Sequence, residues 1–400
     1  MSGDGLSPAR LARLHEVLAG HVQRGEVAGV ATVTCRHGHT RIDTIGCQDL
    51  ARGDPMRRDT LFRIASMSKP ITAVAAMILV EEGVITLDEP LDRLLPELAG
   101  RRVLRRIDSP LTDTEPARRA LTLRDLLTFR LGIGLLIGPP ERYPIQRAMN
   151  ELQLIGRKPP TPCAPDEWIR RLGTLPLMYQ PGERWIYHVG SEILGVLIAR
   201  ASGLPLESFL RQRLFEPLGM RDTGFHVPLG QLGRLASCYQ PTGPGGALEL
   251  FDDARDSQWS RPPAFPNGGN GLVSTLDDYL AFGRMLLGHG QLGGTRILSR
   301  PGVATMLIDY LTAEQKDGTG FTPSFWDNRG WGFGLAIVTR RDSLFTTPGR
   351  FGWNGVYGTS WACDPHEDLV AILMIQRLSY DPVARINQDF WTLLYQAIDD

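Results

Sequence analysis

Lysine is scarce in this 400-residue chain, which has only Lys69, Lys158 and Lys316 among its 43 basic residues. The charges balance to a net −1, so no excess of one sign favours nucleic acid or an anionic membrane surface as a partner. No apolar run reaches the roughly 20 residues that a membrane-spanning helix needs. The first ten residues contain no apolar core of a signal peptide. We therefore expect a cytoplasmic protein.

Cysteine is also sparse, and its spacing excludes two kinds of framework. No Cys-x-x-Cys pair occurs, so neither a zinc knuckle nor a disulfide-stapled fold is expected from the scattered Cys35, Cys47, Cys163, Cys238 and Cys363. His37 and His39 share a predicted turn but have no third ligand nearby in the sequence. We accordingly expect no metal site and no cofactor.

The most informative stretch is residues 61–83, in which an apolar approach becomes an apolar helix. Ser66 is expected to cap this helix, Pro70 falls in its first turn, and Gly83 ends it. Because the helix is apolar nearly all round, it should run through the middle of the molecule. Ser66 and Lys69 are three residues apart, so they share one helix face.

This serine–lysine pair is suited to nucleophilic catalysis. A serine hydroxyl is a weak nucleophile until a base removes its proton, and a lysine can be that base when burial disfavours its charged form. A helix N-terminus adds backbone N–H groups that stabilise an oxyanion. The alternative is that Ser66 only caps the helix and Lys69 is solvated, but an apolar helix argues against solvation.

The order of predicted elements indicates an α/β domain built from both ends of the chain. Strands are predicted at both ends (27–35, 40–46, 333–340, 351–364 and 368–376) and terminal helices at 8–24 and 383–398. Helices dominate the middle, with Thr122 and Thr275 as helix caps and other helices at 166–175, 191–201 and 205–214. Residues 101–120 are expected to form an exposed loop or hairpin, and 135–165 to form proline-rich loops. The arginines of the first segment (Arg101, Arg102, Arg105 and Arg106) are expected to be solvated, the alternative being an anion site. We predict an α/β domain from residues 1–85 and 295–400, an inserted helical domain from 86–294, and an active site at their interface.

Three separated motifs resemble one family. They are Ser66-Met67-Ser68-Lys69, Tyr187 within Pro181-Gly182-Glu183-Arg184-Trp185-Ile186-Tyr187, and Trp353-Asn354-Gly355. Their order and spacing are similar to those of the serine β-lactamase-like superfamily of penicillin-binding proteins, specifically the class C-like esterases called family VIII carboxylesterases. The resemblance covers roughly residues 10 to 395. It implies the β-lactamase/transpeptidase-like α+β fold, with an antiparallel sheet flanked by the terminal helices.

The resemblance also implies an acyl-enzyme mechanism. Ser66 would be the nucleophile, and Lys69 and Tyr187 would share a proton, either of them acting as the base. The backbone N–H groups of Ser66 and Val356 would form the oxyanion hole. Substrate would contact the strand residues Trp353, Asn354 and Gly355, and also His188. The alternatives without a direct part in the reaction are a core tyrosine at Tyr187 and a supporting or surface role for His188.

Two departures from the family pattern indicate the substrate. Class C β-lactamases have Tyr-x-Asn where this chain has Val189, and Lys-Thr-Gly where it has Trp353-Asn354-Gly355. Trp353 cannot form an ion pair with a β-lactam carboxylate and offers an apolar wall with one N–H donor. We therefore expect an esterase for small, uncharged, short-chain esters with weak β-lactam turnover at most.

Other functions stay open at this stage. An acyltransferase would use the same acyl-enzyme but pass the acyl group to an alcohol. A β-lactamase or D,D-peptidase is disfavoured by Trp353 and Val189, and a non-catalytic binding protein by the intact motifs. Ser360 lacks the closing glycine of a Gly-x-Ser-x-Gly elbow, so a structural role is expected for it. The oligomeric state is left open.

Overall fold

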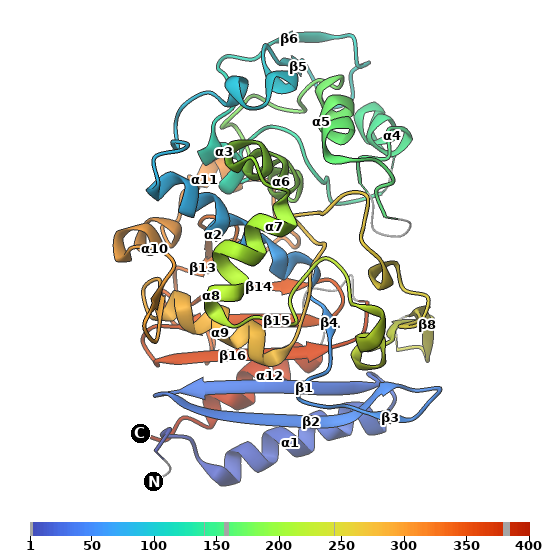
Figure 1. The fold of residues 1–400 in the computed structure, drawn as a ribbon, viewed down its shortest axis with the longest axis vertical. Helices are drawn as coiled ribbons and strands as arrows, with labels where there is room; N and C mark the ends of the chain where they lie inside the picture. The colour runs from blue at the N-terminus through green and yellow to red at the C-terminus, as the bar shows by residue number, and fades with distance from the viewer. Residues whose placement is uncertain (1–2, 140, 156–159, 244, 379–384) are drawn as a thin grey trace.

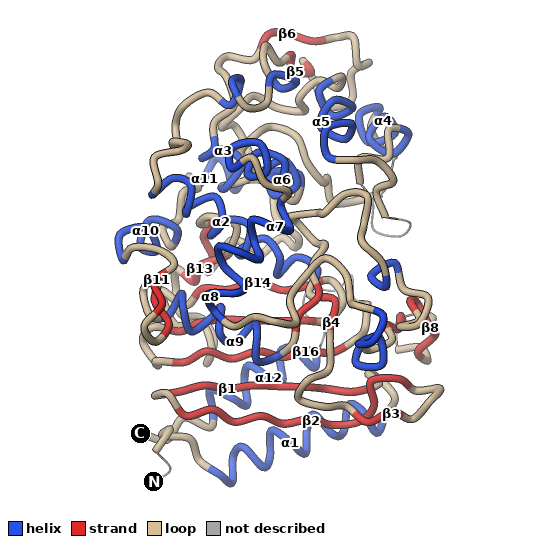
Figure 2. Tube along the Cα trace, viewed as in Figure 1, coloured by secondary structure: helices blue, strands red, loops and turns tan. Residues whose placement is uncertain are grey.

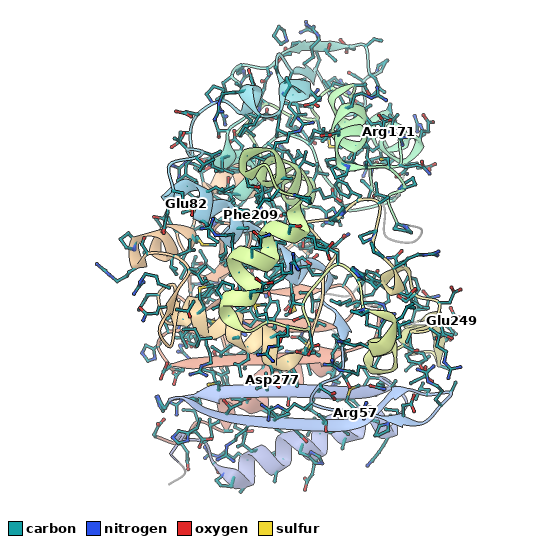
Figure 3. The ribbon with its side chains drawn as sticks, in the orientation of Figure 1. Arg57, Glu82, Arg171, Phe209, Glu249 and Asp277 are labelled. Carbon is teal, nitrogen blue, oxygen red and sulfur yellow. The ribbon has the colours of Figure 1, made fainter. Side chains whose placement is uncertain are left out.

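The computed structural model describes residues 3–139, 141–155, 160–243, 245–378 and 385–400. A large sheet lies toward one end of the molecule and a mostly helical part toward the other (Figures 1 and 2). The two ends of the chain lie close together beside the sheet, where Leu6 bridges Ile398. Charged side chains such as Arg57, Glu82 and Asp277 lie on the outside of these elements (Figure 3).

The sheet has eight strands in the order β12-β13-β14-β15-β16-β1-β2-β3, and every neighbouring pair is antiparallel. The strands from the first part of the chain join those from the last part at β1 and β16, where Val30 pairs with Ile375 and Arg36 with Leu369. The strands are β1 (Gly29–Arg36), β2 (His39–Asp49), β3 (Asp54–Pro55), β12 (Arg329–Trp331), β13 (Ala336–Val338), β14 (Phe351–Gly355), β15 (Thr359–Asp364) and β16 (Leu369–Ile375).

Helices cover both faces of this sheet. On one face, α1 (Pro8–Gln23) and α12 (Arg385–Gln396) pack on each other and bury Leu18, Phe390 and Leu394 against Val30 and neighbouring strand residues. On the other face lies α9 (Leu276–Leu287), whose Gly283 allows the helix to approach Trp361. A Cβ at Gly283 would be 2.7 Å from the indole nitrogen of Trp361, so the close packing needs glycine.

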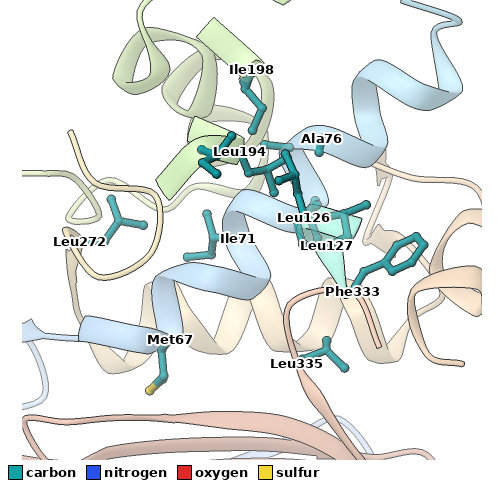
Figure 4. Close-up of a cluster of buried hydrophobic side chains, with 14 of the residues drawn as sticks. Met67, Ile71, Ala76, Leu126, Leu127, Leu194, Ile198, Leu272, Phe333 and Leu335 are labelled. Atoms are coloured by element: carbon teal, nitrogen blue, oxygen red, sulfur yellow. The ribbon is translucent and has the colours of Figure 1, made fainter. Parts of the chain in front are cut away.

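The apolar helix predicted after residue 66 is α2 (Ser68–Glu81), and it is buried through most of its length. It packs on α6 (Val189–Ser202), and α3 (Leu123–Leu127) packs on α6 in turn. Figure 4 shows the apolar side chains gathered around α2, among them Ile71, Leu126 and Leu194. Burial of these side chains fixes the position of the N-terminal end of α2, where Ser66 and Lys69 lie.

Smaller elements complete the helical part and the rim. The helices are α4 (Pro144–Glu151), α5 (Pro165–Gly173), α7 (Leu206–Leu210), the π-helix η4 (Arg211–Phe215), α8 (Glu216–Leu218), α10 (Arg300–Met306) and α11 (Ala313–Lys316). The 3₁₀ turns are η1 (Ala65–Met67), η2 (Leu91–Arg93), η3 (Pro96–Leu98), η5 (Leu229–Arg234) and η6 (Gln258–Ser260). Two-stranded pairs join β4 (Phe62–Arg63) to β9 (Val273–Ser274), β5 (Arg102–Leu104) to β6 (Thr114–Pro116), β7 (Cys238–Pro241) to β8 (Leu248–Asp252) and β10 (Gln291–Leu292) to β11 (Thr295–Arg296). Of the described helices, none alone is long and apolar enough to cross a bilayer; Val189–Ser202 and Leu206–Leu218 would be so only as a pair, which bends by 78°.

Several local predictions are confirmed. Thr122 caps α3 in a capping box with Asp125, and the hydroxyl of Thr275 accepts from the backbone N–H of Asp278 at the start of α9. The predicted hairpin in 101–120 is β5–β6. The start predicted for the last helix, Val383, lies outside the described residues, as do Pro140, Lys158 and Pro159 of the predicted proline-rich loops.

Four local predictions are wrong. Residues 135–165 are not all loop, because the helix α4 lies within them and starts at Pro144, a position at which a helix tolerates proline. Ser66 does not cap the helix, because α2 begins at Ser68 and Ser66 sits in the preceding 3₁₀ turn. Residues 351–364 form two strands, not one, because Gly358 takes a φ of 92° in a tight turn between them. Arg101 is buried, not solvated: its guanidinium donates to the backbone carbonyls of Gly173 and Leu175, and burial lowers its pKa to about 10.

Candidate active site

Ser66 lies at the turn where a short strand becomes the central helix. The approach is fixed by β4 pairing with β9 and by the N–H of Ile64, which donates to the carbonyl of Leu272 over 3.0 Å. Ala65 then takes a positive φ of 44°, a strained conformation for a residue with a Cβ. The chain turns sharply at this point, which leaves Ser66 half-buried at the wall of a cavity.

Lys69 lies one turn further on and is fully buried, so the solvated alternative is excluded. Its side-chain nitrogen Nζ lies 3.0 Å from Ser66 Oγ, 2.6 Å from the carbonyl oxygen of Gly269 and 3.3 Å from His188 Nδ1. It also lies 4.7 Å from the centre of the Tyr187 ring. Three possible acceptors therefore surround Nζ, as many as a protonated amine has N–H donors.

Tyr187 is brought to this lysine by the segment that enters α6. The carbonyl of Tyr187 accepts from the N–H of Leu135 over 2.8 Å, which fixes the backbone. Its hydroxyl accepts a hydrogen bond of 2.7 Å from the indole Nε1 of Trp353. Tyr187 therefore has a side-chain contact at the site and is not only a core tyrosine. Its ring packs edge-on against an aromatic cluster that includes Phe129, Phe321 and Trp331.

The strand β14 runs directly beside the Ser66 turn. Gly355 makes this possible, because a Cβ there would lie 2.4 Å from the carbonyl oxygen of Ile64. The hydroxyl of Thr359 across the hairpin donates to that same carbonyl over 3.3 Å. This places Val356, just after the strand, at the wall of the same cavity as Ser66.

Asn354 is positioned differently from its neighbours. Its Oδ1 accepts from the hydroxyl of Ser360 over 2.7 Å, and that hydroxyl accepts from the indole of Trp391 on α12 over 3.0 Å. The side-chain oxygen of Asn354 therefore bonds Ser360, which links it to Trp391 on α12. The same contacts give Ser360 a structural role, as its sequence context predicts.

His188 lies behind Lys69 and is almost fully buried. Its φ of 93° is unusual for a non-glycine residue. Its Nδ1 faces Lys69, and its Nε2 lies 3.4 Å from Oε1 of Glu192, one turn along α6. His188 also lines one arm of the cavity.

Sequence reasoning missed Glu192, Asn267 and Gly269. Glu192 accepts a hydrogen bond of 2.7 Å from Asn267, and Asn267 accepts one of 2.8 Å from the N–H of Gly269. A signal was present for Glu192: it is an acidic residue in the middle of an otherwise apolar helix, four residues after His188. For Asn267 and Gly269 the sequence shows only a glycine-rich turn.

Two neighbouring pockets, here called the two arms of the cavity, both have Ser66 and Val356 in their walls. One arm is lined by His188 and by aromatic and amide side chains, including Phe225, Gln258, Trp259 and Phe265. The other contains Tyr187 and Trp353 and is lined by Leu135, Leu136, Phe321 and Phe325. Within the described part of the chain, no three His, Cys, Asp or Glu side chains are placed to hold a metal ion.

Comparison with known proteins identifies the family. The family model described as Beta-lactamase matches residues 14–395, so the chain belongs to the β-lactamase family. Protein Rv1367c of Mycobacterium tuberculosis is 41% identical over 373 residues, covering 90% of each chain. Esterase EstB of Burkholderia gladioli is 31% identical over 393 residues, covering 92% of this chain and 91% of that one.

A solved structure confirms the fold. It is described as "EstCE1, a hydrolase with promiscuous acyltransferase activity", has a TM-score of 0.78 at 23% identity, and covers 98% of this chain and 99% of that one. The predicted β-lactamase-like family, the mixed α/β fold with its antiparallel sheet, and the predicted enzyme class, a serine hydrolase, are thus confirmed. The finer assignment to the family VIII carboxylesterases stays a prediction.

Proposed function

We propose that the protein is a carboxylesterase that hydrolyses short-chain esters through an acyl-enzyme on Ser66. The observation that carries the proposal is the 3.0 Å contact between Lys69 Nζ and Ser66 Oγ beneath a cavity that also contains Tyr187. The esterase EstB, with which the chain shares 31% identity, supports the choice of ester as substrate class.

The reaction balances with these residues alone and one water. Ser66 Oγ attacks the ester carbonyl while its proton passes to the Lys69–Tyr187 pair, and the N–H groups of Ser66 and Val356 would hold the oxyanion. The carbonyl–oxygen bond to the alcohol then breaks, and the alcohol leaves with that proton. Water attacks the acyl-enzyme by the same route, releasing the acid and restoring Ser66.

The proposed preference for uncharged esters over β-lactams rests on Trp353. In this chain the group that contacts the Tyr187 hydroxyl is a neutral indole N–H, which donates one hydrogen bond but cannot pair with a carboxylate. Aromatic and aliphatic side chains line the same arm, including Phe321, Phe325 and Leu135. Such walls favour apolar groups of an ester.

Transfer of the acyl group to an alcohol is the second candidate. EstCE1 is described as a hydrolase with promiscuous acyltransferase activity, which favours this candidate. In this chain hydrolysis and transfer would proceed through the same acyl-enzyme. The cavity arm beside Tyr187 would hold either the leaving alcohol or an accepting one. The ratio of ester product to acid product in the presence of added butanol distinguishes the two.

The first experiment mixes the enzyme briefly with p-nitrophenyl butyrate and follows both nitrophenol release and intact protein mass. Wild type should turn over, and its adduct of one butyryl group should map to Ser66. The Ser66→Ala variant should show neither. Turnover that survives Ser66→Ala, or an adduct on another residue, contradicts the proposal.

We also propose a cytoplasmic location. All five cysteines are free thiols, although several lie deep in the fold, such as Cys238 and Cys363. Free thiols throughout are what a reducing compartment favours. Fractionation of cells that express the protein at its natural level checks this: recovery in the membrane or secreted fraction would contradict it.

A further inference from the structure

Five buried groups behind Ser66 form a closed ring of polar contacts. Lys69 Nζ contacts His188 Nδ1 over 3.3 Å, and His188 Nε2 lies 3.4 Å from Glu192 Oε1. Glu192 accepts from Asn267 over 2.7 Å, and Asn267 accepts from the N–H of Gly269 over 2.8 Å. The carbonyl of Gly269 returns to Lys69 Nζ over 2.6 Å. The ring reaches the reacting serine through Lys69.

Burying the carboxylate of Glu192 costs free energy, and the cationic groups of the ring offset that cost. It is fully buried, and within the described part of the chain its second oxygen, Oε2, has no hydrogen-bond partner. A buried carboxylate is costly unless a cation lies near it. The cationic groups within the ring are Lys69 and, when protonated, His188. The carboxylate is therefore placed to balance positive charge at the catalytic lysine.

The order of groups in the ring sets the tautomer of His188. An ammonium can only donate, so His188 Nδ1 must accept when Lys69 is charged. The remaining ring proton is then on Nε2, facing the carboxylate of Glu192. A carboxylate that fixes the tautomer and orientation of a histidine is a common arrangement at functional sites.

The backbone of His188 is strained in a way that fits this role. His188 takes φ 93° and ψ −69° at the start of α6, which is an unfavourable conformation for a residue with a side chain. Such strain persists only where surrounding contacts over-determine it, and it concentrates at functional sites. The ring supplies those contacts on both nitrogens of the imidazole.

The other charged groups on elements packed against α6 have their own partners. Tyr187 adjoins the ring through Lys69. On α3, Asp125 pairs with Arg119 and Arg124 with Asp88. On α5, Glu167 pairs with Arg170 and Arg171, and Asp166 pairs with Arg200 at the far end of α6, which also pairs with Glu97. Glu207 of α7 pairs with His226. On α2, Lys69 is the charged residue nearest to the start of α6, and Glu81 lies at the opposite end of the helix.

We propose that His188 and Glu192 form a positioning pair that holds Lys69 in place and sets the charge balance of the Ser66–Lys69–Tyr187 group. The proposal rests on the proposed function, since it concerns the same nucleophile. Glu192 orients His188, and His188 accepts a hydrogen bond from Lys69. Asn267 links the two remaining members, because it donates to Glu192 and accepts from the N–H of Gly269. Neither His188 nor Glu192 exchanges bonds with the substrate.

The test is the pH profile of kcat/KM for p-nitrophenyl butyrate in wild type, Glu192→Gln and Glu192→Asp. Removing the carboxylate makes it easier for the cationic groups of the ring, Lys69 and protonated His188, to lose a proton. The Glu192→Gln variant should therefore reach half-maximal kcat/KM about one pH unit lower than wild type. Because Lys69 is then held less firmly, kcat should fall by about tenfold or more. Glu192→Asp keeps the charge and should recover most of the profile.

The matched control is Asp278→Asn, which changes another buried carboxylate to an amide on α9, away from the ring. Asp278→Asn should leave the pH at which kcat/KM is half-maximal unchanged. An unchanged profile in Glu192→Gln, or the same displacement in Asp278→Asn, overturns the proposal. Circular dichroism shows whether each variant is folded. If wild type forms no Ser66 adduct, the proposed function fails. If wild type forms the adduct but Glu192→Gln leaves the pH profile unchanged, only the proposed His188–Glu192 pair is refuted.

A measurement on wild type covers the case in which Glu192→Gln does not fold. The ¹⁵N chemical shifts of His188 report which ring nitrogen carries the proton. The proposal requires the proton on Nε2 at neutral pH, and a proton on Nδ1 alone overturns it. The His188→Asn variant completes the set, because Asn tolerates positive φ and its Oδ1 can still accept from Lys69. Its kcat should exceed that of His188→Ala by several-fold, and equal values contradict the role of Nδ1.

Discussion

The indole N–H of Trp353 donates to the hydroxyl of Tyr187 over 2.7 Å, and the two rings lie 5.6 Å apart between centres. This contact joins β14 to the segment that enters α6, which come from distant parts of the chain. It also orients one lone pair of the Tyr187 oxygen toward the strand.

The first prediction removes this donor. Trp353→Phe keeps an aromatic wall but leaves the Tyr187 hydroxyl without the indole, so we expect kcat/KM for p-nitrophenyl butyrate to fall by about 10- to 100-fold. The control is Trp326→Phe, a tryptophan of the same cluster whose indole donates to Thr319. Its kcat/KM should change by less than about threefold. Equal effects of the two variants would mean that packing, not the hydrogen bond, is what matters.

The second prediction places a charge where the indole is. Trp353→Lys puts an ammonium beside Tyr187, and an ammonium can pair with the carboxylate of a β-lactam. We expect the ratio of nitrocefin to p-nitrophenyl butyrate turnover to rise by about tenfold or more. Trp353→Met, with similar length and no charge, should not raise the ratio. A rise with both variants would trace the effect to space alone.

The third prediction concerns the pH dependence of stability. Burial raises the pKa of the Asp278 carboxyl from 3.8 to about 6, although it accepts hydrogen bonds from Asp222 and Thr223. Because the folded state holds this proton more tightly than the unfolded chain, its stabilising contribution is complete below about pH 4 and is lost as the pH rises through 6. Relative to wild type, Asp278→Asn should gain on the order of 1 to 3 kcal/mol between pH 4 and pH 7.

Urea unfolding of both proteins at pH 4, 5, 6 and 7 measures this difference. The informative quantity is how the gap in unfolding free energy changes with pH. A gap that stays constant would mean that Asp278 titrates alike in the folded and unfolded chain.

The fourth prediction compares a buried with an exposed ion pair. Arg63 and Asp252 are both buried, and the guanidinium donates to the carboxylate and lies 5.3 Å from the ring of Trp259. Asp252→Asn leaves the buried guanidinium without a counter-charge and should lower the unfolding free energy by about 3 to 5 kcal/mol. Asp277→Asn breaks the exposed pair with Arg58, 2.8 Å apart, and should cost less than about 1 kcal/mol. Similar losses in the two variants would contradict this assignment.

The periodicity of apolar residues and the spacing of the Ser66–Lys69 motif were enough to predict the elements around the site. The apolar helix α2 and its burial follow from residues that are apolar nearly all round, and the Ser66–Lys69 contact follows from a spacing of three. The caps at Thr122 and Thr275 follow from side chains that can accept from the first turn. The division into residues 1–85 with 295–400 and 86–294 stays a prediction.

Contacts between residues far apart in the sequence could not be predicted from the sequence. Nothing local shows that the backbone carbonyls at 172–175 would surround Arg101, which is why its burial was missed. The ring through Lys69, Glu192 and Asn267 depends on three segments, α2, α6 and residues 267–269, that meet only in the folded protein. The position of Ser66 ahead of the helix was also missed, because it depends on the backbone strain at Ala65 rather than on side-chain preference.

The pairing of β1 with β16 has a consequence during synthesis. The edge of β1 that receives β16 stays open until the chain has been extended from residue 36 to residue 375. At the usual translation speeds of about 5 to 20 residues per second, that delay is on the order of 20 to 70 seconds. Throughout it, the strand Gly29–Arg36 exposes unpaired backbone and the apolar side chains of Val30 and Val33. Nascent chains of this protein should therefore depend on chaperones that hold hydrophobic segments until the last strands emerge.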